Sequence, residues 1–370
     1  MKISYGATAF LLALMPVAAV AAQPEPPPSW TGFYAGLNAG YSWDASKSAS
    51  VSTAGTADPA WTPSGLPGSA SGQQAASFLA ALSSGTAGVS ANGFMGGVQA
   101  GYNQQLTTYL VGGVEVDFQG SAMRGRGTFS KTSSWGGGFG PFTGTVEVPY
   151  QVYSDGAGYW SITQGGNTTI PTTIYVPYSL TGSGSYGLNG NSSTVVTKSV
   201  NSLSTVRGRI GDLISPGLLA YATGGLAFGR VDSSTATAQT FGGALSASGT
   251  FATSSPYVNP CAAPGDPYCG LTNYSGSNSV AFPLNGASMI RSSYSGTKVG
   301  WTFGGGLEWM IATNWSVKGE YLYYSLGTVT TGGTGALINP QTGAVQAYMT
   351  QVTHVSFDGH IARAGINYHF

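Results

Sequence analysis

The stretch SFDGHIARAGINYHF, from Ser356 to Phe370, decides the fold that the sequence predicts. From residue 362 onward its even positions are apolar and its odd positions are small or polar, which is the period of two that a β-strand gives its two faces. A strand between hydrocarbon and a polar lumen requires this alternation, and about 9 to 11 tilted residues cross a bilayer. Because an open sheet edge cannot face lipid, the pattern predicts more such strands, closed into a barrel.

The composition favours a membrane barrel over a soluble domain or a bundle of membrane helices. Only 7% of the 370 residues are charged, against roughly 25% in soluble domains. Mean hydropathy is nevertheless only +0.06, and no apolar run after residue 22 reaches the about 18 residues of a spanning helix. The 13 basic and 13 acidic residues balance, which argues against a nucleic-acid partner, since nucleic acid selects a basic face.

The N-terminus has the pattern of a secretory signal peptide over residues 1–22, with Lys2, a short apolar core and small residues ending at Ala22. A membrane anchor is the alternative, but the apolar core is short and no stop-transfer charges follow it. Residues 23–29 are rich in proline and predict a stiff, extended periplasmic spacer. We expect residues 30–370 to form one outer-membrane barrel domain.

The period of two recurs in eight stretches, joined alternately by long Ser/Thr/Gly-rich segments and by short turns. The expected strands are about 33–43, 93–106, 109–121, 203–214, 218–232, 297–311, 315–327 and 356–370. Up-and-down barrels have this alternation, with long loops outside the cell and with short turns and both termini in the periplasm. The predicted fold class is therefore all-β: an eight-stranded antiparallel up-and-down transmembrane β-barrel with long extracellular loops and short periplasmic turns.

A soluble β-sandwich is the alternative fold. It has no reason to place every long connection on one side, and its outer faces would need more charge. The longest connection, about residues 122–201, contains two strand-like segments that carry Pro149 and Pro177. Proline suits edge strands or loop hairpins better than central ladders.

Eight charged residues of the expected strands fall on the face opposite the apolar one. They are Glu115, Asp117, Arg207, Arg209, Glu308, Lys318, Glu320 and Arg363. The interior of an eight-stranded barrel is just wide enough for side chains, so these four acids and four bases are predicted to pair across the lumen as a closed network. Each unpaired charge there would cost several kcal/mol. The functional alternative is a proton or ion path through the lumen.

Aromatic residues on the apolar face concentrate near strand ends. They are Phe33, Tyr41, Trp43, Phe118, Trp301, Trp309, Trp315, Tyr323, Tyr368 and Phe370. Such residues form girdles at the two membrane interfaces. An ordinary aromatic core, the alternative, would not place them at strand ends.

Few other residues suggest chemistry. Cys261 and Cys269 lie in one expected surface loop, and a disulfide is predicted because the periplasm is oxidising. A rim-located membrane enzyme is the least favoured alternative, because His354 and Asp358 fit a nucleophile scheme only when forced into it. No catalytic or metal site is expected. Glycines 304–306 lie within a strand, where they make room for large lumen side chains.

Eight motifs, in chain order, resemble a known family. They are WTGFYAGLNAGY (30–41), GFMGGVQAGYN (93–103), VGGVEVDF (111–118), TVRGRIG (205–211), YATGGLAFG (221–229), GWTFGGGLEWM (300–310), WSVKGEYLYYSLG (315–327) and RAGINYHF (363–370). They resemble the alphaproteobacterial outer-membrane β-barrel family of immunogenic and haemin-binding surface proteins, which often carry a porin-family description. The likeness covers every expected strand and none of the loops. Ile366, Tyr368 and Phe370 likewise resemble the C-terminal signal by which outer-membrane barrels are recognised for assembly.

The resemblance implies an outer-membrane surface protein with a structural or envelope role, whose loops contact surfaces or ligands. The implied partners are outer-membrane lipid, the barrel-assembly machinery during biogenesis, and a host or environmental surface. A narrow porin-like channel or a haemin-binding receptor is the alternative, with haemin as a ligand and no cofactor. No enzymatic activity is expected.

Overall fold

The computed structural model describes residues 29–59, 70–154, 160–161, 171–253 and 275–370. The predicted signal peptide, most of the proline-rich spacer, and both cysteines lie outside these residues. The elements are β1 (Gly32–Asp44), β2 (Ser48–Ala57), α1 (Ala70–Ser83), β3 (Gly85–Gly88), β4 (Asn92–Gln105), β5 (Leu110–Ser154), β6 (Trp160–Ser161), β7 (Pro171–Ser215), β8 (Leu218–Thr253), β9 (Ser275–Ala312), β10 (Trp315–Ile338) and β11 (Val345–His369). The described residues contain no helix that is long and apolar enough to cross a membrane.

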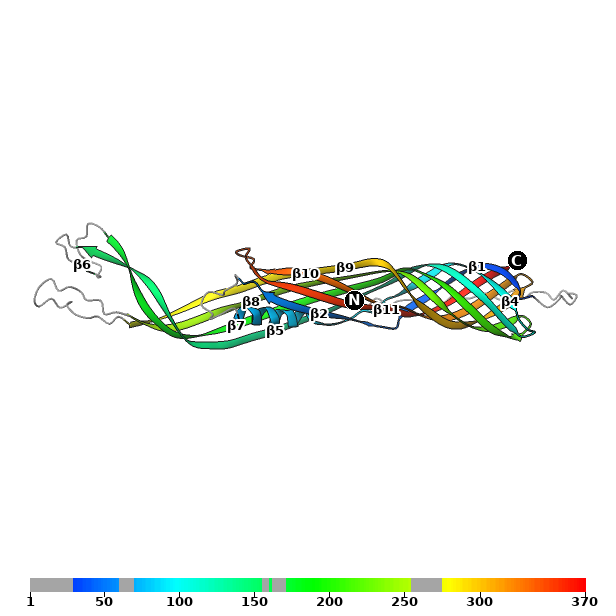
Figure 1. Cartoon of the computed structure of the whole chain (residues 1–370), viewed down its shortest axis with the longest axis horizontal. Helices are drawn as coiled ribbons and strands as arrows, with labels where there is room; N and C mark the ends of the chain where they lie inside the picture. The colour runs from blue at the N-terminus through cyan, green and yellow to red at the C-terminus, as the bar shows by residue number, and fades with distance from the viewer. Residues whose placement is uncertain (1–28, 60–69, 155–159, 162–170, 254–274) are drawn as a thin grey trace, which may run out of the picture.

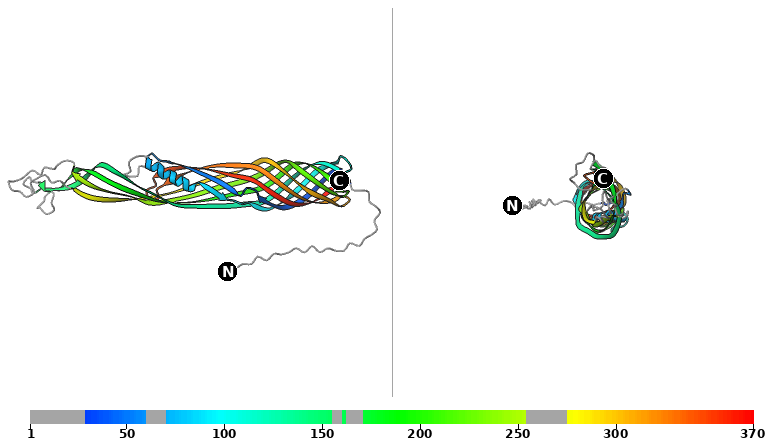
Figure 2. Two further views of the ribbon diagram at one scale, coloured as in Figure 1. Left: turned by 90° about the horizontal axis from the view of Figure 1, so that it is seen from below. Right: turned by 90° about the vertical axis from the view of Figure 1, so that its left-hand side faces the viewer.

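The sheet closes on itself because its first and last long strands pair. β1 pairs antiparallel with β11, from Tyr34↔His369 to Asp44↔Gly359, and on its other side with β4. From β4 the pairings run through β5, β7, β8, β9 and β10 back to β11. The result is a long cylinder (Figure 1), which appears as a ring of strands when seen end-on (Figure 2).

The sheet contains eleven strands, more than the eight expected. β2 pairs with β11 beyond the end of β1, from Ala49↔Val355 to Ala57↔Ala347, β3 pairs with β2, and β6 pairs with β5. The segment 44–92, expected to be loop, therefore carries two strands and the helix. Ser, Thr, Ala and Gly occupy both faces of β2, so it lacks the apolar–polar contrast that reveals a strand.

Much of what the sequence predicts as long loops is instead a continuation of the strands. β5 and β7 have 45 residues each, and β8 and β9 have 36 and 38. At about 3.3 Å per residue, β5 is roughly 150 Å long along its path, several times what a bilayer requires. Pro149 and Pro177 lie in the β5–β7 ladder, beyond Tyr178↔Thr253, which is the last β7–β8 pair among the described residues.

Two strands exchange their inner and outer faces along their length. In β7, even positions are buried up to Val200 and odd positions from Leu203, and the ladder to β8 changes register between them. In β10 the same exchange occurs at Gly327, whose φ of +76° is one that glycine adopts at little cost. Both are β-bulges, which turn a strand over by inserting one residue.

The end of the cylinder that holds the C-terminus has an apolar outer wall, called here the apolar belt. Its exposed side chains include Phe33, Leu37, Phe94, Val98, Val114, Phe118, Val206, Ile210, Leu226, Val299, Trp301, Leu307, Trp309, Trp315, Ile366, Tyr368 and Phe370. Aromatic rings touch one another at its borders, as in Trp315–Tyr368 and Trp43–His360, with centroids 5.1 and 5.7 Å apart. A soluble protein rarely exposes so large a contiguous apolar surface.

Candidate functional site

The interior of the cylinder, at the level of the belt, collects the eight charged residues that the sequence places on the lumen face. Glu115, Asp117, Arg207, Arg209, Glu308, Lys318, Glu320 and Arg363 are each at most 5% exposed. The ladder register brings them together: Glu115 lies opposite Arg207 across β5–β7, and Glu320 lies opposite Arg363 across β10–β11. Alternation along each strand then sends every one of these side chains inward.

Two arginines form the centre of this charged cluster. Arg207 donates from Nη1 to Glu320 at 2.8 Å and from Nη2 to Asp117 at 3.1 Å, and it also bonds Glu115. Arg363 donates from Nε to Glu320 at 2.6 Å and from Nη2 to Asp117 at 2.9 Å. Both guanidiniums therefore join acids that come from strands on different sides of the barrel.

The remaining charges extend the cluster toward the C-terminal end. Arg209 Nη2 lies 2.5 Å from Glu308 Oε2, and Lys318 Nζ lies 2.8 Å from Glu115 Oε2. Glu308 also accepts hydrogen bonds from Ser316 at 2.6 Å and Asn367 at 2.7 Å. All four acids thus have cationic partners, as a buried charged group requires.

Neutral side chains that sequence reasoning did not single out complete the cluster. The Tyr34 hydroxyl donates to Glu115 at 2.7 Å and Tyr221 donates to Glu320 at 3.1 Å. The Arg209 guanidinium lies 4.4 Å from the Tyr221 ring centroid, within range of a cation–π contact. A Cβ on Gly306 would lie 2.8 Å from the Tyr221 hydroxyl, so this glycine makes room for a lumen side chain. The signal was visible for Tyr34, a lone aromatic on the small and polar face of its strand.

An apolar cluster closes the interior at the end with the short turns. It consists of Trp30, Val111, Leu213, Leu219, Tyr221 and Met310. Trp30 is fully buried and its indole Nε1 donates to the Pro216 carbonyl at 3.0 Å. Met310 follows Glu308 by two residues on the same inward face, so this cluster lies between the charged residues and the short turns.

A second apolar layer closes the interior on the opposite side of the charges. Leu322 follows Glu320 by two residues and Ile361 precedes Arg363 by two residues, each on the same inward face of its strand. The layer contains Ala49, Val51, Ala87, Val89, Ala91, Met95, Met123, Val196, Val200, Leu203, Ala227, Val231, Leu322, Tyr324, Leu326, Val329, Val355, Phe357 and Ile361. We call it the middle apolar layer.

Helix α1 closes the cylinder further along. Ala75, Ala76, Leu79 and Leu82 of the helix pack with Leu188, Phe241, Ile290, Leu337, Ala347 and Met349 of the strands. Hydrogen bonds fix its ends: Gln73 donates to the Gly55 carbonyl at 2.8 Å, and Thr53 N donates to Ser84 Oγ at 2.9 Å. Along the cylinder the interior thus holds an apolar cluster, the charged cluster, the middle apolar layer, buried hydroxyl and amide side chains such as Thr194, Thr237 and Gln351, and the helix.

The other predicted site residues lie apart from this interior. His354 is exposed on the outer wall, where its Nδ1 lies 2.9 Å from Thr330 Oγ1, and Asp358 accepts a hydrogen bond from Ser46 at 2.9 Å. His354 lies within β11 rather than at a strand end. Ile366, Tyr368 and Phe370 are exposed on the belt, and their role in assembly stays a prediction. The described residues contain no group of side chains able to hold a metal ion.

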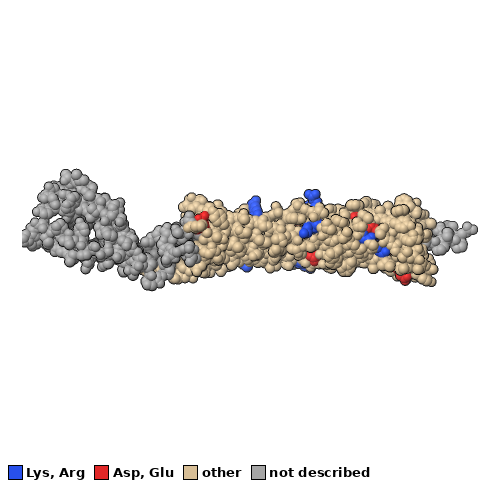
Figure 3. Space-filling view, in the orientation of Figure 1, with Lys and Arg blue, Asp and Glu red and all other residues tan. Residues whose placement is uncertain are grey.

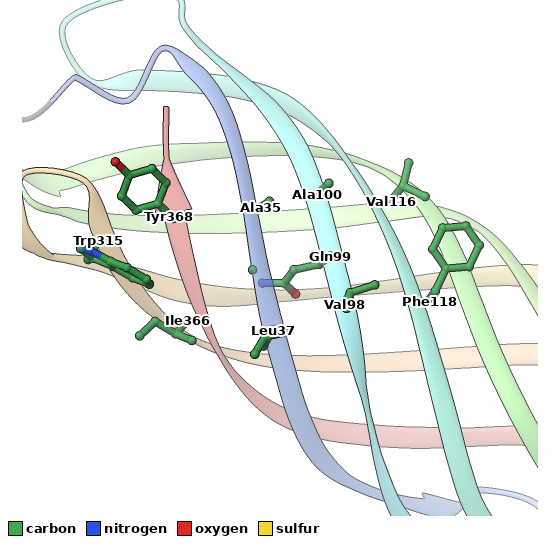
Figure 4. A pocket seen from close by; sticks show the side chains of 11 residues that line it. Ala35, Leu37, Val98, Gln99, Ala100, Val116, Phe118, Trp315, Ile366 and Tyr368 are labelled. Atoms are coloured by element: carbon green, nitrogen blue, oxygen red, sulfur yellow. The ribbon is translucent and has the colours of Figure 1, made fainter.

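A shallow groove of about 600 Å³ lies on the belt itself, where small residues such as Ala35 and Ala100 leave space on β1 and β4. Figure 4 shows Phe118, Trp315 and Tyr368 around it. The amide of Gln99 reaches Asn367 Oδ1 at 2.5 Å and is buried. The lining of the groove is therefore almost entirely apolar and presents few polar groups to a ligand.

No protein-family model matches the chain. The 31 kDa outer-membrane immunogenic proteins of Brucella melitensis and Brucella suis are each 28% identical to it over 300 residues, which is 81% of this chain and 72% of theirs. The chain is a homologue of these alphaproteobacterial proteins. The family resemblance of its strand motifs is thereby confirmed.

Solved structures are far less similar to this homologue. The outer membrane protease OmpT from Escherichia coli is 9% identical, with 90% of this chain and 97% of that chain covered and a TM-score of 0.19. A FadL homologue from Pseudomonas aeruginosa is 8% identical, with 92% and 90% covered and a TM-score of 0.17. Scores this low carry no argument about fold or function.

Proposed function

We propose that this homologue of the immunogenic proteins is a sealed outer-membrane barrel that anchors a projecting sheet and displays it at the cell surface, in a structural rather than a catalytic role. One observation carries the proposal. The interior at the level of the belt is filled by packed layers, while β5, β7, β8 and β9 continue far beyond the belt.

The apolar belt supports insertion into a bilayer. The proposed membrane-spanning barrel is the closed circuit of β1, β4, β5 and β7–β11, with the short turns and both termini in the periplasm. Exposed side chains such as Leu37, Val98 and Phe118 would be costly in water and favourable in hydrocarbon. The outer-membrane names of the two Brucella relatives point to the same membrane.

The layered interior supports a closed barrel over a narrow channel. An ion that passed through would have to separate the pairs around Arg207 and Arg363 and then cross the middle apolar layer, where it would lose its hydration. Either step costs several kcal/mol per charge. The charged cluster therefore fills the interior of the barrel and fixes the pairing register of its strands.

The outer wall beyond the belt supports display. It is rich in hydroxyl pairs that join neighbouring strands, such as Thr197–Ser234 at 2.7 Å, Thr328–Ser356 at 3.1 Å and Ser130–Ser193 at 3.2 Å. These hydroxyls make the wall hydrophilic, and Figure 3 shows few charged side chains on it. It suits a sheet that projects through a hydrated layer to meet a host or environmental surface.

Tag accessibility on intact cells tests the orientation. An epitope inserted between Gly165 and Gly166, in the connection from β6 to β7, should bind antibody on intact cells. The same epitope inserted between Thr107 and Thr108, at a short turn, should bind only after the outer membrane is permeabilised. Antibody binding at the second tag on intact cells would contradict the proposed orientation.

Haemin binding is the second candidate function, and the exposed imidazole of His354 favours it. Haemin titration of wild-type protein and of His354→Ala, followed by absorbance, tests it. A saturable spectral shift that disappears in the variant would support a receptor role. Identical titrations of the two proteins would exclude His354 as a haemin ligand.

A further inference from the structure

The surface cations of the described residues lie on one side of the belt. Lys47, Arg124, Arg126, Lys131, Arg230, Arg291 and Lys298 all lie beyond it, toward the extended strands, whereas the exposed side chain of Asp212 carries negative charge at the short-turn end. In the proposed orientation the cations face the outer leaflet. Positive charge beside a bilayer attracts anionic lipid headgroups.

Two of these arginines line a groove of about 820 Å³ that crosses β5, β7, β8 and β9. The ladder register builds it from two parallel rows of residues. One row is Arg124, Ser199, Asp232 and Ser295, and the other is Arg126, Thr197, Ser234 and Ser293. Each row therefore begins with an arginine and continues in small side chains that can donate or accept hydrogen bonds.

The groove lies directly beside the aromatic border of the belt. Arg124 is the ladder partner of Asn92 on β4, and Asn92 Oδ1 accepts a hydrogen bond from Tyr41 at 3.0 Å. Phe94, which is 74% exposed, is only two residues away along β4, about 7 Å. Arg124 is therefore placed at headgroup depth if the belt lies in hydrocarbon.

The two guanidiniums are free to bind an anion. Arg124 and Arg126 are exposed on the same face of β5, two residues apart, and neither has an ion pair among the described residues. Like charges so close together repel each other, and a phosphate between them would relieve that repulsion through charge-assisted hydrogen bonds.

The groove also contains one acid. Hydrogen bonds from Ser295 and Asn201 lower the pKa of Asp232, so it stays ionised and held in its row. Arg230, two residues away on β8, offsets its charge. A fixed carboxylate beside hydroxyls and an amide suits the hydroxyl groups of a sugar.

We propose that this groove binds the phosphorylated sugar headgroup of an outer-leaflet glycolipid, with the phosphate on Arg124 and Arg126 and the sugar hydroxyls toward Asp232. The proposal rests on the membrane placement proposed above. The belt beside the groove favours a lipid over a soluble phosphate, since the acyl chains of a lipid would lie on the belt while its headgroup fills the groove.

Lipid titration of the refolded full chain in uncharged detergent tests the proposal. Bis-phosphorylated lipid A is the probe, native mass spectrometry reads the bound fraction, and heat-modifiable migration on gels verifies folding. Arg124→Ser with Arg126→Ser should weaken binding roughly 25-fold, about fivefold for each arginine. The matched control, Lys131→Ser with Arg291→Ser, removes the same charge further from the belt and should change affinity less than about twofold.

Further arms separate the possible sources of the anion. Dephosphorylated lipid A should bind wild-type protein about as weakly as the intact lipid binds the double variant. Arg124→Lys with Arg126→Lys keeps the charge but loses the bidentate geometry, and it should give an intermediate affinity. Inorganic phosphate at millimolar concentration should not displace the lipid.

Three results would overturn the proposal: equal lipid A affinity in wild type and the serine double variant, equal affinity for the dephosphorylated lipid, or displacement by inorganic phosphate. Failure of the membrane placement is distinguishable. In that case the refolded wild-type chain would not insert into liposomes at all, whereas failure of the inference alone leaves an inserted barrel without arginine-dependent binding.

Discussion

Lys198 Nζ lies 2.5 Å from Asp44 Oδ2, and both side chains are buried beside the middle apolar layer. Lys198 also donates to the carbonyls of Ser46 and Ser356, at 2.9 and 3.2 Å, and Asp44 accepts from Ala91 N at 2.7 Å. The pair thus ties β7 to the end of β1 and to β11, at the level where the belt gives way to the extended strands. It is a second buried ionic contact, separate from the eight-residue cluster.

Removing one partner of this pair should be strongly destabilising. Lys198→Met leaves the Asp44 carboxylate buried without its cation, and we expect a loss of about 3–5 kcal/mol in the free energy of unfolding. Urea unfolding in detergent micelles measures it. Lys131→Met, an exposed lysine on β5, should change stability by about 0.5 kcal/mol or less. Equal losses of unfolding free energy in the two variants would show that the buried pair of Lys198 and Asp44 contributes no more to stability than an exposed lysine does.

The charged cluster should matter for stability and not for conductance. Glu320→Ala removes one of the acids that Arg207 and Arg363 share and leaves both arginines with only Asp117 and Glu115, so unfolding should become easier by about 3–5 kcal/mol. Planar-bilayer recordings of the same variant should match wild type, because the apolar layers on both sides of the cluster stay in place. A new conductance with unchanged stability would point to an ion path instead.

Trp30 should act as the apolar seal at the short-turn end. Trp30→Ala removes a fully buried side chain, so a loss of about 3–5 kcal/mol is expected. Trp30→Phe keeps most of the packing and loses the hydrogen bond to Pro216, for which about 1 kcal/mol is expected. Thermal unfolding followed by circular dichroism would compare the two, and a larger loss for Phe than for Ala would refute the packing role.

The bulge in β10 should depend on glycine at position 327. A residue with a side chain is strained at a φ of +76°, so Gly327→Val should destabilise the barrel by more than about 1 kcal/mol. Gly319 provides the control, because its φ is ordinary and a Cβ there would meet open space. Equal shifts of the urea midpoint for Gly327→Val and Gly319→Ala would show that the bulge in β10 does not depend on glycine at position 327.

The faces of the belt-level strands could be predicted from the sequence because one face meets hydrocarbon and the other meets charge. Arg207 and Glu320, for example, stand out among apolar neighbours on their strands, and the structure brings them within 2.8 Å of each other. Sequence reasoning gave the cluster only charged members. The face of Tyr34 could be predicted from its small and polar neighbours, but the acids on other strands that Tyr34 and Tyr221 contact could not. Their hydroxyls become visible only when strands distant in sequence are adjacent.

The upper part of the cylinder could not be predicted in the same way. Its strands meet water outside and small polar side chains inside, so Ser, Thr and Gly occupy both faces and no contrast remains. The bulge before Leu203 also reverses the inner and outer faces of β7. Alternation continued from Arg207 back to Lys198 would therefore have placed the Lys198 side chain on the outer face. Helix α1 did leave a signal, because Ala75, Ala76, Leu79 and Leu82 recur at helical spacing.

Conductance of the refolded wild-type chain in planar bilayers tests the central claim of a sealed barrel most directly. Heat-modifiable migration would first show that the protein is folded. We expect no steady conductance above the lipid baseline, because the apolar layers on both sides of the charged cluster leave ions no hydrated path. A steady, voltage-independent conductance of general-porin size would contradict the account.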